Sequence, residues 1–152
     1  MELSIRLDGK IAIVTGGAMG IGFGMAEGLA SVGATVVIAD INKEAADKAA
    51  ANINAEGGKA VAYELDITDS TRYNAVVNSV ADEFGSIDIL VNNAGINKRN
   101  ICINMPEEDW KRIIDINLTG AWIGSKAVAP FMIEQKAGKI INVCSIMGFV
   151  SL

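Results

Sequence analysis

Histidine is absent from the 152 residues, and cysteine occurs only twice. A chain without histidine cannot form a Ser-His-Asp triad or nearly any known catalytic zinc arrangement, and we predict no metal site. Cys102 and Cys144 lie far apart in apolar contexts, which is typical of a reducing, cytoplasmic protein rather than of a disulfide framework. We expect Cys144 to be a small core residue. Any chemistry must come from hydroxyls, amides, carboxylates, lysines or a bound cofactor.

Basic residues and long apolar runs are also scarce. The chain has 13 Lys+Arg against 18 Asp+Glu, a net charge of −5, and no basic cluster. We therefore expect neither nucleic acid nor a membrane as a partner. No apolar run could span a bilayer, and Met1–Arg6 lacks the apolar segment of a signal peptide. With 51% hydrophobic residues, the chain can bury the core of one domain, which we assign to residues 1–152.

Apolar strands alternate with helical segments along the whole chain. Continuous apolar, β-branched runs predict buried parallel strands, and we expect Asn42 to cap one helix and Gly138 to end another. The predicted strands are 11–14, 35–39, 59–65, 87–91 and 139–144, and the predicted helices are 20–32, 43–55, 70–84 and 106–135. This order predicts an α/β fold with a Rossmann-type, doubly wound parallel sheet, truncated after the fifth strand.

Clustered glycines join the first strand to the first helix. Backbone N–H groups at a helix start lack partners within the helix, and the helix dipole favours negative charge there. Gly16, Gly20 and Gly22 would let a diphosphate approach the backbone without a clash from Cβ atoms. We predict that this turn binds a dinucleotide, with the backbone around Met19 and Ile21 holding the pyrophosphate. The alternative is a closely packed strand–helix turn without a ligand.

Asp40 and Ile41 follow the second strand, about twenty residues beyond the glycines, where an acid can accept hydrogen bonds from a ribose diol. The charge of Asp40 would repel a 2′-phosphate, which favours NAD over NADP as the cofactor. The neighbouring Lys43 could tolerate a phosphate and so argues the other way. Asp40 could also be a solvated turn or cap residue, although Asn42 already suits the cap.

Four motifs in this order resemble the classical short-chain dehydrogenase/reductase family. They are Thr15-Gly16-x-x-x-Gly20-x-Gly22, Asn92-Asn93-Ala94-Gly95, Asp115-Ile-Asn117-Leu and Ser145-x-x-Gly148. The resemblance extends from about Leu7 to the end of the sequence. Extended members of the family usually show a G-x-x-G-x-x-G spacing that is absent here.

The resemblance implies roles for particular residues. It assigns an adenine contact to Asp66 and the backbone of Ile67, and it places Asn93, Ala94 and Gly95 beside the cofactor ribose. It implies that Asn117 supports a proton path and that Ser145 holds the oxygen of the substrate.

Each of these residues also has a purely structural interpretation. Asp66 could cap a helix, the Asn93–Gly95 segment could be a polar turn, and Ser145 could be a turn serine. Asn117 is unusual for the buried interior of a helix, where an amide needs partners, and it could instead bridge neighbouring backbone. We expect Asn92 to brace the sheet.

The proton donor is missing from the resemblance. The family supplies it with a tyrosine whose pKa is lowered by a lysine four residues later. Tyr63 and Tyr73 are the only tyrosines, and neither has a lysine at that offset. The resemblance implies that this residue pair and a sixth strand would follow Leu152. We therefore expect the N-terminal portion of a longer dehydrogenase, the alternative being a short dinucleotide-binding module without turnover.

The function implied is that of an NAD-dependent oxidoreductase interconverting a secondary alcohol and a ketone. Gly95–Arg99 and Asn142–Ser145 are similar to gluconate 5-dehydrogenase-like members, which suggests a sugar acid or polyol substrate. A 3-oxoacyl thioester reductase is the alternative. Lys98 and Arg99 could attract a substrate carboxylate, but a solvated loop is the better interpretation. The family implies a homo-oligomer, a tetramer or dimer, joined partly through the long helix.

Overall fold

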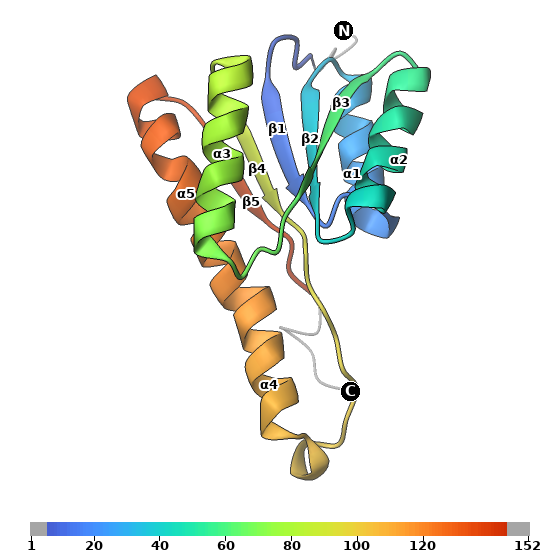
Figure 1. Cartoon of the computed structure of the whole chain (residues 1–152), viewed down its shortest axis with the longest axis vertical. Helices are drawn as coiled ribbons and strands as arrows, with labels where there is room; N and C mark the ends of the chain where they lie inside the picture. Colours follow the sequence, from blue (N-terminus) through green and yellow to red (C-terminus); the bar gives the residue numbers. More distant parts are fainter. Residues whose placement is uncertain (1–5, 146–152) are drawn as a thin grey trace, which may run out of the picture.

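Five parallel strands form one sheet in the order β3-β2-β1-β4-β5 (Figure 1). In this computed structural model, which describes residues 6–145, the strands are β1 (Ile11–Thr15), β2 (Thr35–Asp40), β3 (Lys59–Glu64), β4 (Ile89–Asn92) and β5 (Lys139–Asn142). Val14 of β1 pairs with Ile38 on one side and with Val91 on the other. The strand order reverses between β1 and β4, which is where open α/β sheets bind ligands. The predicted doubly wound α/β fold is confirmed.

Helices cover both faces of the sheet. On one face α1 (Gly20–Ser31) and α2 (Lys43–Ala55) pack through alanines against Val14, Val36 and Ile38. On the other face α3 (Ser70–Phe84) and α5 (Gly120–Gln135) pack against Ile13 and Leu90. Successive residues of a strand point to opposite faces, so a strand covered on both sides must be apolar throughout. This is why β1 and β2 are continuous apolar runs in the sequence.

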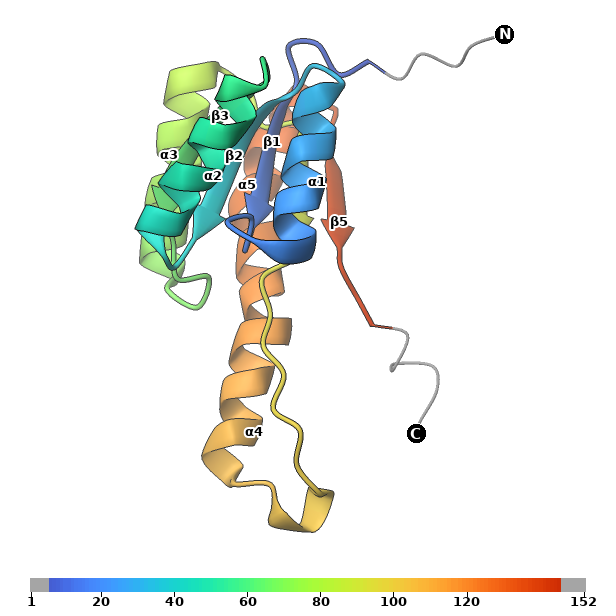
Figure 2. The ribbon, with the colours of Figure 1, turned by 90° about the vertical axis from the view of Figure 1, so that its right-hand side faces the viewer.

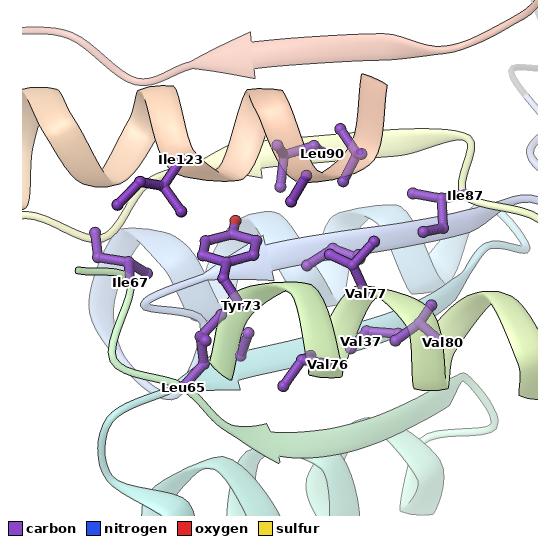
Figure 3. Close-up of a cluster of buried hydrophobic side chains, with 14 of the residues drawn as sticks. Val37, Leu65, Ile67, Tyr73, Val76, Val77, Val80, Ile87, Leu90 and Ile123 are labelled. Atoms are coloured by element: carbon purple, nitrogen blue, oxygen red, sulfur yellow. The ribbon is translucent and has the colours of Figure 1, made fainter. Parts of the chain in front are cut away.

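The core between α3, α5 and the sheet contains the buried Tyr73 (Figure 3). Its ring packs among Val76, Val77 and Ile123, and burial raises the pKa of its hydroxyl. That hydroxyl lies close to Gly124, where a Cβ would be only 2.3 Å from it, and it has no hydrogen-bond partner among residues 6–145. Small residues on α5 thus allow the two helices to approach closely.

Asn92 joins β4 to its neighbours on two sides. Its Nδ2 donates to Asn142 Oδ1 at 2.9 Å and to Ala121 O and Ser125 Oγ at 3.2 Å each. Its backbone oxygen accepts from Val143 N at 3.0 Å. The expectation that Asn92 braces the sheet is confirmed.

The long predicted helix is one continuous helical run with a change of pitch inside it. It comprises α4 (Glu107–Ile114), the π-helical η2 (Asp115–Thr119) and α5, after a short 3₁₀ turn η1 (Cys102–Asn104). It ends at Gln135 with Lys136 in the left-handed region, at φ 54°, so the prediction that Gly138 ends it was wrong. Gly138 is needed for packing, because a Cβ there would lie 2.4 Å from Met132 Cγ.

Part of the apolar surface is open to solvent among the described residues. All of β5 is exposed at the sheet edge, and α4 projects beyond the sheet (Figure 2). Along the helical run, Trp110, Leu118 and Trp122 are exposed. Cys144 is exposed as well, so its prediction as a core residue was wrong, because it follows an uncovered edge strand.

Residues 6–145 contain neither a membrane-spanning helix nor a metal-binding cluster. No helix in this range has the length and apolar character needed to cross a membrane. No group of three or more Cys, Asp or Glu side chains there could hold a metal ion.

Candidate cofactor-binding site

A cleft of about 450 Å³ opens at the carboxyl ends of the strands, where the strand order reverses. Loops after β1, β2, β3 and β4 line it together with one side of the helical run. The lining residues are Gly16, Met19, Ile21, Gly22, Asp40, Ile41, Leu65, Asp66, Ile67, Asn93, Ala94, Gly95, Ile96, Arg112 and Ile116. Every predicted cofactor residue except Gly20 is in this set, so the folded chain brings together segments up to about 80 residues apart in sequence.

The glycines are required by the shape of the turn. Gly16 has a φ of +62°, and a Cβ there would lie 2.9 Å from Ala94 Cα. A Cβ on Gly22 would lie 2.1 Å from the carbonyl oxygen of Gly16. Gly20 begins α1 with a φ of +57° and open space around it, so it shapes the turn without lining the cleft. Larger residues at Gly16 and Gly22 would push the turn away from the end of β4.

The first turn of α1 has no cap of its own. Met19 occupies the N-cap position with extended backbone angles and no side-chain hydrogen bond, and no acidic residue lies in the first turn. The Met19 side chain is 66% exposed and cannot accept a hydrogen bond from the N–H groups that follow. These donors and the helix dipole are therefore available to an anion in the cleft.

Thr15 and Asn93 connect the ends of β1 and β4. The buried Thr15 Oγ1 accepts from Asn93 N at 3.0 Å and from Ala94 N at 3.1 Å. Asn93 Nδ2 donates to the carbonyl oxygens of Thr15 at 3.0 Å and Gly16 at 3.2 Å. The amide of Asn93 thus fixes the carbonyl groups at the start of the glycine turn, and the residue also lines the cleft.

Asp40 is held by backbone donors on both sides. Its Oδ2 accepts from Ala18 N at 3.2 Å, and its Oδ1 accepts from Asn42 N at 3.0 Å. The cap of α2 is Asn42, whose Oδ1 accepts from Ala45 N at 3.0 Å, as predicted. The carboxylate of Asp40 therefore faces the glycine turn from the end of β2 and is not the helix cap.

Asp66 organises the loop after β3. Its Oδ1 accepts from Thr68 N at 2.9 Å and from Thr68 Oγ1 at 2.7 Å. Asp69 caps α3 instead, accepting from Arg72 N at 2.9 Å. The second carboxylate oxygen of Asp66 accepts no hydrogen bond from residues 6–145, and the residue lines the cleft.

Asn117 fastens the segment that leaves β4. Its Oδ1 accepts from Ile96 N and its Nδ2 donates to Ile96 O, each at 2.8 Å. The residue is exposed and sits in the π-helical η2, so its expected place in a buried helix interior was wrong. The contact matches the structural alternative, a bridge to backbone, and it holds Gly95 beside the cleft. Asn117 itself does not line the cleft.

Ser145 follows β5 and is exposed, three residues beyond Asn142. It does not line the cleft, and the Gly148 of its motif lies outside the described residues. Lys98 is ion-paired with Asp109, which agrees with a structural role in the loop more than with capture of a substrate carboxylate.

Four further residues line the cleft that the sequence did not lead us to expect. Leu65, Ile96, Arg112 and Ile116 all line the cleft, but none of them was predicted as a site residue. Arg112 and Ile116 are four residues apart in one helical run, a spacing that places side chains on the same side of a helix. That four-residue spacing, which leads from Ile116 inside the Asp115–Leu118 motif back to Arg112, is a signal that could have found them.

Comparison with known proteins agrees with this geometry. A family model described as short chain dehydrogenase matches residues 10–152. The chain belongs to the short-chain dehydrogenase family. It is 41% identical to the 3-oxoacyl-[acyl-carrier-protein] reductase FabG of Thermotoga maritima over 95% of the chain and 58% of that protein. It is 42% identical to the 5-keto-D-gluconate 5-reductase of Escherichia coli K12 over 91% of the chain and 55% of that protein.

A solved structure gives the same result for the fold. The structure of 7 alpha-hydroxysteroid dehydrogenase complexed with NADH and 7-oxo glycochenodeoxycholic acid superposes with a TM-score of 0.92 at 37% identity. The match covers 97% of this chain and 57% of the other. The chain thus spans little more than half the length of the dehydrogenases it resembles.

Proposed function

We propose that this chain is the NAD(H)-binding part of an oxidoreductase that interconverts a secondary alcohol and a ketone. The observation that carries the proposal is the uncapped start of α1, which meets the acid-bearing ends of β2 and β3 in one cleft. A diphosphate fits the free N–H groups of the turn, and Gly16 and Gly22 leave no Cβ to obstruct it. Bound there, NAD(H) would supply the hydride exchanged with the substrate.

The charges around the second strand support NAD rather than NADP. The carboxylate of Asp40 lines the cleft and would repel a 2′-phosphate on the ribose. Lys43, the cation that could have offset it, is ion-paired with Asp47 one turn along α2. Ile41, Ile67 and Ile116 also line the cleft and offer apolar contacts that would suit an adenine ring.

Titrating the protein with NADH and NADPH tests the proposal, with binding followed by calorimetry. We expect NADH to bind at least about tenfold more tightly than NADPH because of the repulsion by Asp40. A preference for NADPH would refute the role of Asp40, and failure to bind either cofactor would refute the cofactor site itself.

On this proposal the residues of this chain position the cofactor and the substrate rather than donate the proton. Ser145 would hold the substrate oxygen, and Asn117, through Ile96, would keep the Gly95 end of the cleft in place and support the proton path. The two tyrosines are engaged elsewhere, since Tyr73 is buried in the core and Tyr63 Oη donates to Glu83 at 3.0 Å. We therefore expect the 152-residue chain to bind NADH without turnover, and measurable NAD-linked reduction by it would contradict this.

A sugar acid or polyol is the substrate class we favour. The support is the similarity to 5-keto-D-gluconate 5-reductase, together with the Gly95–Arg99 and Asn142–Ser145 segments. A 3-oxoacyl thioester is the second candidate, supported by the similarity to FabG. Assaying sugar acids, polyols and acyl thioesters with each cofactor, in the full-length enzyme, distinguishes the two.

We also propose that the enzyme is a cytoplasmic homo-oligomer, a dimer or tetramer. The support for assembly is the exposed apolar side of the helical run, with Trp110, Leu118 and Trp122. Both cysteines are exposed and unpaired, which suits a reducing compartment. Sedimentation equilibrium would show a monomer at micromolar concentration if the proposed assembly is wrong.

A further inference from the structure

Arg112 lines two adjoining clefts. A second cleft of about 600 Å³ runs along α4 and η2, lined also by Thr68, Glu108, Lys111, Asp115 and Thr119. It shares Ile41, Asp66, Arg112 and Ile116 with the cofactor cleft. Ile41 and Asp66 belong to the end of the cofactor cleft proposed for adenosine. Arg112 therefore lies at the end of the cleft proposed for adenosine.

The guanidinium of Arg112 has no hydrogen-bond or ion-pair partner among residues 6–145. The neighbouring Lys111 is paired with Glu107 at 2.7 Å, and Lys98 is paired with Asp109. Asp66 lines the same cleft but forms no ion pair with Arg112, and its Oδ1 is already used by Thr68. A cation that lines an acidic cleft without pairing is available to a ligand.

We propose that the guanidinium of Arg112 stacks on the adenine ring of the bound dinucleotide and thereby strengthens cofactor binding. The inference rests on the proposed function. A guanidinium is planar and weakly hydrated, so it stacks on aromatic faces, whereas a lysine ammonium is a compact and strongly hydrated charge. Ile116, one turn further along the same helical run, lines the cleft beside it and adds apolar contact.

Stacking on the base fits this site better than pairing with a ribose phosphate. The cleft holds the carboxylates of Asp40 and Asp66 against the single cation of Arg112 among its lining residues. A phosphate bound by Arg112 in this cleft would also be repelled by the two carboxylates that line it. An uncharged base is not repelled by these carboxylates.

The test compares three variants of the full chain with wild type. Arg112→Met keeps a stem of similar length but removes the guanidinium plane, and Arg112→Lys keeps the charge without the plane. Lys111→Met is the matched control, because Lys111 is the adjacent cation and does not line the cofactor cleft. The dissociation constants of NADH, ADP-ribose and reduced nicotinamide mononucleotide are measured by calorimetry, and thermal unfolding confirms that each variant folds.

We expect both Arg112 variants to weaken NADH and ADP-ribose by about three- to tenfold, the range of a cation–π contact. Reduced nicotinamide mononucleotide should bind all variants alike, and Lys111→Met should match wild type. Wild-type affinity for NADH in Arg112→Met, or full affinity in Arg112→Lys, would overturn the stacking proposal while leaving the cofactor site intact. If wild type itself fails to bind NADH, the proposed function fails with it.

Discussion

Three helices begin at the same edge of the sheet, but α1 begins differently from α2 and α3. The side chains of Asn42 and Asp69 cap α2 and α3, each accepting from a backbone N–H three residues later. Met19, in the same position before α1, offers no acceptor. A side-chain cap contributes about 1 kcal/mol to stability, so α1 forgoes a stabilisation that its neighbours have.

The contrast separates two helix starts that satisfy their own backbone donors from one whose donors have no side-chain partner. Asn42 and Asp69 accept from the backbone donors at the starts of α2 and α3. Asp40 and Asp66 therefore do not serve as helix caps. The start of α1 is closed tightly against β4 at Gly16 and Gly22 but leaves its donors open to the cleft. The missing cap of α1 is informative because α2 and α3, which begin at the same edge, both have a side-chain cap.

The largest expected effect comes from filling the turn of α1. Gly22→Ala places a methyl group 2.1 Å from Gly16 O and 2.5 Å from Asn93 Nδ2, so the turn must shift. We expect a loss of about 1–3 kcal/mol in the free energy of unfolding. NADH affinity should fall at least about a hundredfold, because the N–H groups move from the cleft. Calorimetry and denaturant unfolding measure both.

Gly24→Ala is the control for this variant, since Gly24 lies on the same helix with open space around it. It should bind NADH normally and gain up to about 1 kcal/mol from the better helix propensity of alanine. Equal binding by Gly22→Ala and Gly24→Ala would show that the turn does not form the site.

Adding to α1 the side-chain cap that α2 and α3 have should raise stability and lower the affinity for NADH. In Met19→Asp the new carboxylate can accept from the open N–H groups and would repel a diphosphate. We expect stability to rise by about 1 kcal/mol and NADH affinity to fall at least about tenfold. Thermal unfolding and calorimetry follow the two quantities, with Met19→Ala as the variant that should change neither. A capped variant with normal affinity would mean that these donors do not bind the cofactor.

Removing the charge beside the turn should change the choice of cofactor. Asp40→Asn removes the repulsion of a 2′-phosphate, so the ratio of the NADPH to the NADH dissociation constant should fall by about tenfold. Asp82→Asn, at an exposed position of α3 outside the cleft, controls for the loss of a charge and should leave the ratio unchanged. An unchanged ratio in Asp40→Asn would place the source of selectivity elsewhere.

The smallest effect on binding is expected from the helix starts that are already closed. Asn42→Ala and Asp69→Ala should each cost about 1 kcal/mol of stability, because each removes a cap. NADH affinity should stay within about twofold of wild type, since the backbone donors of the cleft are untouched. Denaturant unfolding beside calorimetry checks this. Loss of affinity comparable to that of Met19→Asp would erase the distinction between the helix starts.

Much of the fold and most of the cleft could be predicted from the sequence. The apolar runs located all five strands within a few residues, and the cap at Asn42 was predicted correctly. These features depend on neighbours a few residues away, so local pattern carries them. The motifs that follow the strands line one cleft because parallel strands end at one edge of the sheet.

The errors involve contacts between distant segments. The exposure of Asn117 and its bonds to Ile96 depend on how the helical run meets the loop after β4, 21 residues earlier. The exposure of Cys144 depends on β5 lying at the sheet edge. Gly138 resembles a helix stop in sequence, but its small size is needed beside Met132.

Local sequence pattern is enough to predict the order of strands and helices, the glycine turn and the acids that follow β2 and β3. Local hydrogen bonding and periodicity suffice to specify such features. Only the folded chain shows that Asp40 accepts from Ala18 N, that Asn93 supports the glycine turn, and that Arg112 lines the same cleft as Asp66. These depend on which strands lie side by side, and that arrangement is set by burial of both faces of the sheet rather than by any one segment.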